Sequence, residues 1–197
     1  MKGLFMLQRI FFVLLMFLMS QLDLALAADE GVPERVVILF DRSASMNAML
    51  DGISKIEMGR QLFKQLAADS GANKNVSVRF FAGGLSSSND ENCKASSVAL
   101  PFGERESSAF EALYQNLTAK GRKTPLTYAI SLAKEDLVGW RGERRIVIIS
   151  DGMDTCGEDP VPLADELGAG GIELDVIGLG EPADLAQLAE MGLASGA

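Results

Sequence analysis

The sequence places five oxygen-bearing side chains next to the ends of predicted strands or just before a predicted helix. They are Asp41, Ser43, Ser45, Thr124 and Asp151. Hard divalent cations such as Mg²⁺ take oxygen ligands in near-octahedral geometry and keep water ligands where the protein supplies few. The alternation of Asp41, Ser43 and Ser45 in the segment DRSAS allows one turn to aim three side chains at one point. These residue types predict a cation site built from carboxylates and hydroxyls.

The charge of this candidate site leaves room for a further ligand. Asp41 and Asp151 are its only formal negative charges, so a bound divalent cation would be nearly neutralised and would keep an open coordination position. Each part also has a simpler interpretation. Asp41 can cap a turn, Thr124 with the following proline can begin a helix, and Asp151 with Gly152 can form a turn. The occurrence of all three parts together favours the cation site.

Strand and helix patterns alternate along the chain, and they would bring these side chains together. Short apolar runs predict strands at 35–40, 76–82, 96–102, 144–150 and 172–179. Apolar residues at helical spacing predict helices at 54–69, 107–117, 125–137, 162–167 and 183–191. This alternation predicts an α/β fold with a doubly wound, mostly parallel sheet and helices on both faces. In such sheets, ligands bind beyond the carboxyl ends of the strands, which is where the five side chains fall.

The composition excludes several kinds of chemistry. The 197 residues include no histidine, which excludes a Ser-His-Asp triad, a Cys-His pair and a His-ligated zinc or haem. The net charge is −9, from 18 basic and 27 acidic residues, which argues against nucleic acid as a partner. A hydrophobic fraction of 48% is ordinary for a globular protein, and the length indicates one domain.

The first residues have the three-part layout of a secretory signal peptide. Two basic residues accompany an apolar run at 10–19, and small residues at 25–27 supply a cleavage site. We predict a signal peptide at 1–27 and a short tail at 28–34. The mature protein is then exported, either periplasmic or secreted, and meets the membrane only through the signal peptide before cleavage. An uncleaved anchor is the alternative, although the apolar run is shorter than the ~20 residues that span a bilayer.

Two cysteines, Cys93 and Cys156, are present in the chain. An oxidising compartment favours a disulfide between them, and two buried free thiols are the alternative. Cys156 follows Asp151 by five residues, and Cys93 follows the predicted strand at 76–82. A disulfide would therefore brace the loops beside the cation site.

Three motifs in this order resemble the von Willebrand factor type A (VWA) domain. They are DRSAS at 41–45, KTPLTYA at 123–129 and SDGMDTCGEDP at 150–160. The last two are similar to those of bacterial exported members. The resemblance implies a VWA domain at 35–192, a short tail at 193–197, and a six-stranded, mostly parallel sheet with one short antiparallel edge strand.

The resemblance also implies a metal-ion-dependent adhesion site (MIDAS) that holds Mg²⁺, or else Mn²⁺ or Ca²⁺. Ser43 and Ser45 would bind the ion through their hydroxyls, and Thr124 would bind it directly or through water. Asp41 and Asp151 would act mostly through waters and hydrogen bonds to the ligands. An Asp or Glu of a protein partner would complete the coordination.

Four further side chains flank these ligands and are candidates for a partner-binding rim. They are Arg42, Arg122, Lys123 and Asp154. The basic residues would attract an acidic partner. The alternative is that these are ordinary solvated loop charges.

The function expected from these observations is metal-dependent protein binding and not enzymatic catalysis. A HAD-type phosphatase also has an Asp after its first strand, but it needs a second acid two residues later, where this chain has Ser43. Metal-assisted hydrolysis by a bound water is an alternative, although no side chain stands out as the general base. A structural domain with an unused metal site is the other alternative.

Overall fold

The computed structural model describes residues 33–70, 75–103 and 108–196. The predicted signal peptide at 1–27 lies outside the described residues, as does most of the tail at 28–34. Within the described residues, no helix combines the length and the apolar character needed to cross a membrane. The folded unit begins at Glu34.

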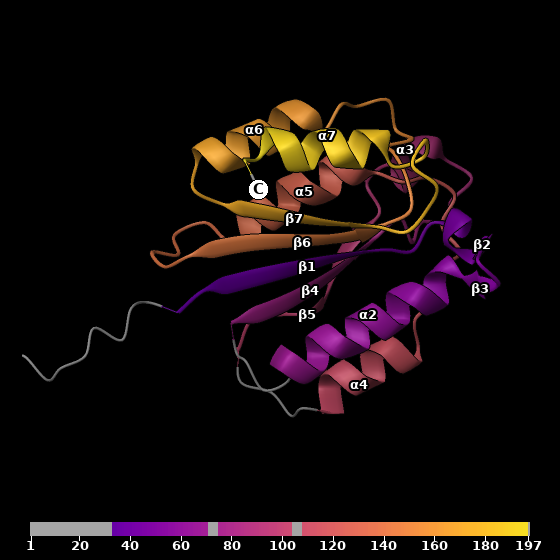
Figure 1. The fold of residues 1–197 in the computed structure, drawn as a ribbon, viewed down its shortest axis with the longest axis horizontal. Coiled ribbons are helices and arrows are strands. Elements are labelled where there is room, and N and C mark those ends of the chain that lie inside the picture. Colours follow the sequence, from indigo (N-terminus) through magenta and orange to yellow (C-terminus); the bar gives the residue numbers. More distant parts are fainter. Residues whose placement is uncertain (1–32, 71–74, 104–107, 197) are drawn as a thin grey trace, which may run out of the picture. The chain divides into compact units, whose positions relative to one another are not determined.

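Strands and helices alternate along this unit (Figure 1). The main sheet contains β1 (Arg35–Asp41), β4 (Val76–Phe81), β5 (Ser96–Leu100), β6 (Arg144–Ser150) and β7 (Glu173–Gly178). The longer helices are α2 (Lys55–Ser70), α4 (Ser108–Gln115), α5 (Leu126–Asp136), α6 (Val161–Ala169) and α7 (Ala186–Ala194). Short elements are the 3-10 turn η1 (Ala44–Asn47), the small ribbon of β2 (Met49–Leu50) and β3 (Ile53–Ser54), and α3 (Asn89–Asn92).

The order of strands in the main sheet is β5-β4-β1-β6-β7. β1 pairs in parallel with both β4 and β6, β6 pairs in parallel with β7, and only the short edge strand β5 is antiparallel. The predicted α/β class, the mostly parallel sheet and the antiparallel edge strand are therefore confirmed. Because the chain leaves β1 toward β4 and later returns to β6 on its other side, the carboxyl ends of β1 and β6 form the topological switch point.

The sheet has five strands in the described residues and not the six that the resemblance implied. The sequence itself carries five apolar strand segments. After β7, the described chain forms α7, which packs against α6 and β7 and does not extend the sheet. The helix continues to Ala194, so it takes in the start of the segment at 193–197 that was expected to be a tail.

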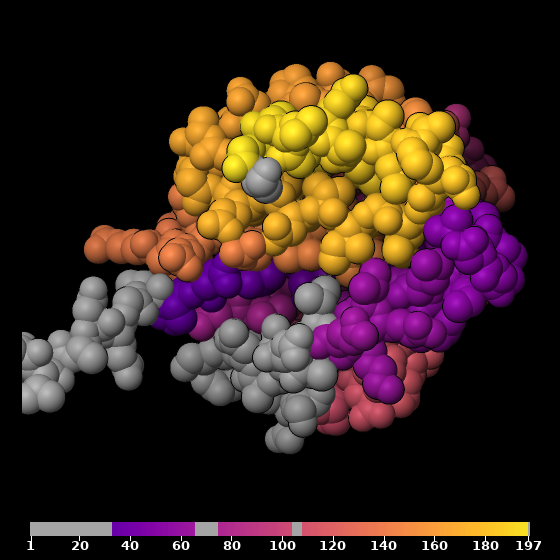
Figure 2. Space-filling model, viewed as in Figure 1, coloured from indigo at the N-terminus to yellow at the C-terminus, as the bar shows by residue number. Residues whose placement is uncertain are grey.

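The central strands are apolar on both faces because helices cover both sides of the sheet. Ile38 and Phe40 of β1 pack in the core beneath α2 and α4, where the Phe40 ring meets the edge of the Phe63 ring. Val37 and Leu39 point to the opposite core, which α5, α6 and α7 cover. Figure 2 shows the two layers, with α2 in purple on one side and the orange and yellow C-terminal segments on the other. This packing holds the carboxyl ends of the strands in place.

Candidate metal centre

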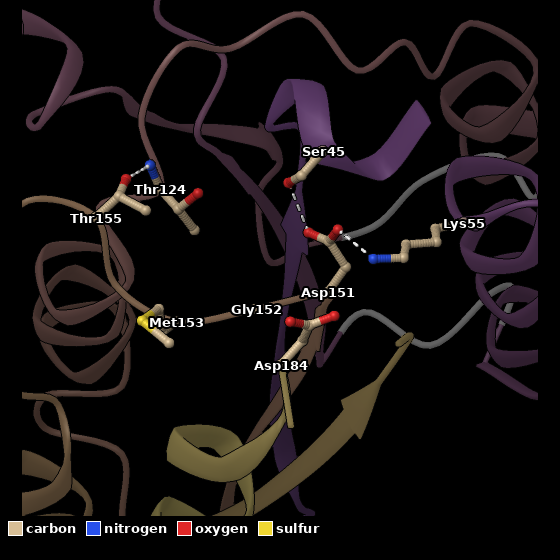
Figure 3. A pocket seen from close by; sticks show the side chains of 8 residues that line it. All are labelled: Ser45, Lys55, Thr124, Asp151, Gly152, Met153, Thr155 and Asp184. Carbon is tan, nitrogen blue, oxygen red and sulfur yellow. Dashed lines mark hydrogen bonds and ion pairs between the residues drawn. The ribbon is translucent and has the colours of Figure 1, made fainter. Parts of the chain in front are cut away.

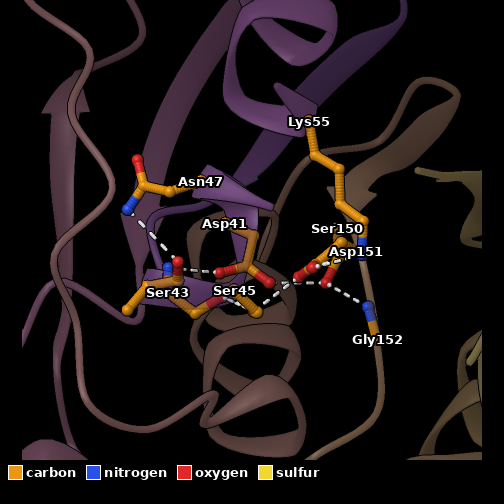
Figure 4. A network of polar contacts seen from close by, with 9 residues as sticks. Asp41, Ser43, Ser45, Asn47, Lys55, Ser150, Asp151 and Gly152 are labelled. Carbon is orange, nitrogen blue, oxygen red and sulfur yellow. Dashed lines mark hydrogen bonds and ion pairs between the residues drawn. The ribbon is translucent and has the colours of Figure 1, made fainter. Parts of the chain in front are cut away.

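A chain of hydrogen bonds joins the ends of β1 and β6 at the switch point (Figure 4). The Ser43 and Ser45 hydroxyl oxygens lie 2.8 Å apart, and the Ser45 hydroxyl donates to Asp151 Oδ1 at 2.9 Å. Asp41 Oδ1 accepts from the Ser43 backbone N–H at 2.7 Å. Asp41 Oδ2 accepts from the Ser150 hydroxyl at 2.6 Å. Four of the five predicted ligands therefore belong to one connected network.

The Asp41 carboxylate is the most deeply enclosed member of the network. The residue has no exposed surface, and burial raises the pKa of its carboxyl from 3.8 to about 6. The hydrogen bonds from Ser150 and Ser43 oppose this rise because they favour the ionised form, while the charge of Asp151 adds to it. A cation beside Asp41 would relieve the cost of ionising it.

We predict that the free energy of unfolding of the metal-free protein contains an Asp41 contribution that falls between about pH 4 and pH 6. In this range the unfolded chain has released the proton, whereas the folded state, with its raised pKa, still holds it. The loss amounts to about 3 kcal/mol and is complete above about pH 6. Urea titrations in chelator measure it. Asp41→Asn should remove this part of the pH dependence, and a wild-type-minus-variant difference that does not vary with pH would contradict the assignment.

Thr124 reaches the same place from a different loop. It is 6% exposed, and it lines a pocket of about 270 Å³ together with Ser45 and Asp151 (Figure 3). Its backbone N–H donates to the Thr155 hydroxyl at 2.7 Å, and its carbonyl accepts from the Thr155 N–H at 3.0 Å. These bonds tie the Thr124 loop to the loop after β6. The structure therefore brings all five predicted ligands to one edge of the sheet.

Gly121 allows the Thr124 loop to lie against the end of β1. Its carbonyl accepts from the Ala44 N–H at 2.8 Å, and its N–H donates to the Arg42 carbonyl at 2.9 Å. A Cβ atom on Gly121 would lie 1.3 Å from the Ala82 carbonyl oxygen. Ala82 itself has a φ of 61°, in the left-handed region, at the turn that follows β4. The missing side chain lets the Thr124 loop lie against the turn after β4, and the two hydrogen bonds hold this loop against DRSAS.

We predict that Gly121→Ala destabilises the protein by about 3 kcal/mol or more, because the added methyl meets a backbone carbonyl that cannot move aside. Gly83→Ala is the matched control, since a Cβ there meets no atom within 4 Å. The control should change the free energy of unfolding by less than about 0.5 kcal/mol. Equal effects of the two substitutions in urea unfolding would contradict this account of Gly121.

Cys93 and Cys156 form a disulfide, as predicted, with their Cα atoms 5.6 Å apart. The bond joins the end of α3 to the loop after β6. In that loop, one Asp154 carboxylate oxygen accepts from the Cys156 N–H at 2.6 Å and the other from the Thr127 N–H at 3.0 Å. The disulfide therefore braces the loop that lies beside Thr124 and Asp151.

We expect reduction of the disulfide to weaken cation binding by about tenfold or more while the sheet stays folded, because the bond supports ligand loops and lies outside the core. Titration of Mg²⁺ with and without reductant, with far-UV circular dichroism in parallel, measures both effects. The double variant Cys93→Ser with Cys156→Ser repeats the test without reductant. Unchanged affinity in the reduced, folded protein would refute the prediction.

The four predicted rim residues have different surroundings. The Arg42 guanidinium donates to the Thr118 carbonyl at 2.8 Å and lines a separate pocket. Lys123 donates to the Thr155 carbonyl at 3.3 Å, and Asp154 holds backbone N–H groups as described above. Arg122 is exposed. Three of the four thus support loops of the protein itself.

Lys55 is one of two residues at this site that the sequence reasoning missed. It opens α2, is 9% exposed, and places its ammonium nitrogen 2.9 Å from Asp151 Oδ2. Its position at the start of a predicted amphipathic helix did not indicate that it would contact Asp151. The exposed Asp184, in the segment between β7 and α7, lines the same pocket and was also missed.

The donor set fits a divalent cation in kind. Two carboxylates and three hydroxyls meet there. Asp41, Ser43, Ser45 and Asp151 share one hydrogen-bond network, and Thr124 lines the pocket together with Ser45 and Asp151. Among the residues that the structure describes, no three His, Cys, Asp or Glu side chains gather in a group that would hold a metal. A cation here would therefore depend on Ser and Thr ligands as well as Asp. Lys55 is the group that opposes it.

The architecture is that of the VWA domain, as the resemblance implied. The VWA protein from Catenulispora acidiphila superposes with a TM-score of 0.57 at 19% identity, over 81% of this chain and 37% of that chain. Proximal thread matrix protein 1 of the mussel byssus has a TM-score of 0.62 at 19% identity, over 81% and 40% of the two chains. At this level of identity, these similarities show the fold.

Two structural neighbours contain a bound metal. Another structure of the mussel protein has a zinc-occupied MIDAS motif (TM-score 0.57, 17% identity, 84% and 46% of the two chains). The Plasmodium vivax TRAP protein is manganese-loaded (TM-score 0.55, 17% identity, 80% and 62%).

Two Bacillus subtilis proteins are similar in sequence. YwmC, an uncharacterized protein, is 27% identical over 151 residues, which are 74% of this chain and 66% of YwmC. YwmD, also uncharacterized, is 26% identical over 159 residues, or 77% and 70% of the two chains. The chain thus spans about two thirds of the length of these relatives. No protein-family model matches the sequence.

Proposed function

We propose that this protein is an exported, divalent-cation-dependent binding module that captures an acidic side chain of a protein partner. The observation that carries the proposal is the network of Asp41, Ser43, Ser45 and Asp151, which opens on the pocket that Thr124 completes. Two structural neighbours, one manganese-loaded and one with a zinc-occupied MIDAS motif, support a metal-binding role for this network. The Cys93–Cys156 disulfide agrees with export, because disulfides persist in oxidising compartments.

Each side chain has a distinct role in this proposal. Ser43, Ser45 and Thr124 supply hydroxyl oxygens to the ion. Asp41 and Asp151 orient the serines and balance the charge. When bound, the cation supplies an electrophilic centre for a carboxylate oxygen. We propose Mg²⁺, with Mn²⁺ or Ca²⁺ as alternatives, because oxygen donors alone suit these ions.

Binding is a better account of this site than catalysis. The chain has no histidine. Both buried carboxylates already hold partners, since Asp41 accepts from Ser150 and Asp151 pairs with Lys55. Neither is therefore free to take a proton from a bound water as a general base would. A protein partner fits a shallow site with an exposed rim, where one charge-assisted contact lies at the centre.

We predict that Mg²⁺ raises the melting temperature of the wild-type protein and that Asp41→Ala abolishes the rise. A cation at a concentration 100 times its dissociation constant raises the free energy of unfolding by about 2.7 kcal/mol. For a protein of this size, that corresponds to a rise in melting temperature of roughly 5–10 °C. Asp165→Ala is the control, because it removes an exposed carboxylate of α6 and should keep the full response. Scanning calorimetry with Mg²⁺ and with chelator provides the measurement.

A pull-down from envelope extract then tests partner binding. Proteins captured by the wild type in Mg²⁺ should be lost with chelator and with Asp41→Ala, and a short Asp-containing peptide should compete where its Asn analogue does not. The same proteins captured under all conditions would contradict a cation-dependent function.

A further inference from the structure

Lys55 places a positively charged side chain at the candidate cation site. Its ammonium lies 2.9 Å from Asp151 Oδ2, and the Lys55 and Asp151 side chains are only 11% and 3% exposed. Lys55 is also the first residue of α2, where the helix dipole disfavours a positive charge. Its ion pair with Asp151 offsets both costs, because a buried charge is tolerated when it is paired.

Both oxygens of Asp151 are occupied by groups of the protein itself. Oδ1 accepts from the Ser45 hydroxyl, and Oδ2 accepts from Lys55 (Figure 3). A divalent cation that approaches the Ser45 side of Asp151 meets an ammonium across the same carboxylate. The like charges repel strongly there, because the surroundings are largely shielded from water. Because Asp151 would balance the charge of the metal, Lys55 and the metal compete for the same negative charge.

The charge count at the site then changes sign. Asp41, Asp151 and Lys55 together carry one net negative charge, and a divalent cation converts this into one positive charge. Asp184 also lines the pocket, but it is exposed, so water screens its charge. This net positive charge equals that of the Lys55 ammonium, and it lacks a full counter-charge until an anion enters the pocket.

We propose that Lys55 is an internal competitor of the cation and that it makes cation binding depend on an acidic ligand. This inference rests on the proposed function of the same site. Lys55 holds Asp151 when no metal is bound and so lowers the affinity for the ion. A ligand carboxylate that enters the pocket neutralises the extra charge and offers Lys55 a new partner. Because such coupling is reciprocal, the ligand strengthens cation binding as much as the cation strengthens ligand binding.

The test compares wild type with Lys55→Met, using Mg²⁺ alone and Mg²⁺ with a capped Gly-Asp-Gly peptide in isothermal titration. Without peptide, Lys55→Met should bind Mg²⁺ about tenfold or more tightly than wild type. The peptide should raise the Mg²⁺ affinity of wild type by about fivefold or more, and that of the variant much less. Lys64→Met, an exposed lysine on the same helix, makes the same change of net charge and should behave as wild type.

Each outcome decides between the two proposals. Equal Mg²⁺ affinity in wild type and Lys55→Met, with binding present in both, overturns the role of Lys55 and leaves the proposed function intact. Tighter binding without any change in the effect of the peptide overturns the coupling. If neither protein binds Mg²⁺, the proposed function fails and this inference fails with it. Lys55→Gln repeats the comparison in case the methionine variant does not fold, and circular dichroism in chelator monitors folding.

Discussion

The site depends on one carboxylate, Asp41, that the fold holds at a sheet edge from which water is excluded. Burial raises its pKa, so the structure must supply compensating donors. Those donors are the Ser43 backbone N–H and the hydroxyl of Ser150, which is the last residue of β6. The parallel pairing of β1 with β6 sets Ser150 beside Asp41, because Phe40 is in register with Ile149. The strand pairing that builds the core of the sheet therefore also fixes the geometry of the site.

The loops around Asp41 are held mainly by one another. Gly121 pairs with the backbone on either side of Ser43, and Thr124 pairs with Thr155 in the loop after β6. The disulfide adds a covalent link from that loop to the end of α3. None of these contacts buries a large apolar surface. The loops therefore depend on backbone hydrogen bonds and close approach, and a methyl group at Gly121 is enough to disturb them.

Much of the fold could be predicted from the sequence, because buried parallel strands and amphipathic helices have strong periodic patterns. The five strands follow from such patterns, and the disulfide follows from the cysteine count. That five oxygen-bearing side chains meet at one edge of the sheet follows from their places in the loops there, while their role as ligands stays a prediction. The ribbon of β2 and β3 was not predicted, because strands of two residues are too short to show a periodic pattern. The ion pair of Lys55 with Asp151 was not predicted, because it joins positions 96 residues apart in the sequence. The hydrogen bond from Arg42 to Thr118 was not predicted for the same reason, since the two residues lie 76 positions apart.

The unpredicted contacts of Lys55 and Arg42 bear on how an acidic partner would be recognised. The chain carries a net charge of −9. Of the three basic side chains expected to attract such a partner, Arg42 and Lys123 are engaged in holding loops, and Arg122 is exposed to solvent, where its charge is screened. Long-range attraction is therefore weak, and at physiological salt it fades within about 8 Å. On the proposed function, positive charge arises only locally, where a cation and Lys55 face the same pocket. Selection of an acidic side chain would then occur at contact, through desolvated charge pairing, and its strength would follow the occupancy of the metal site.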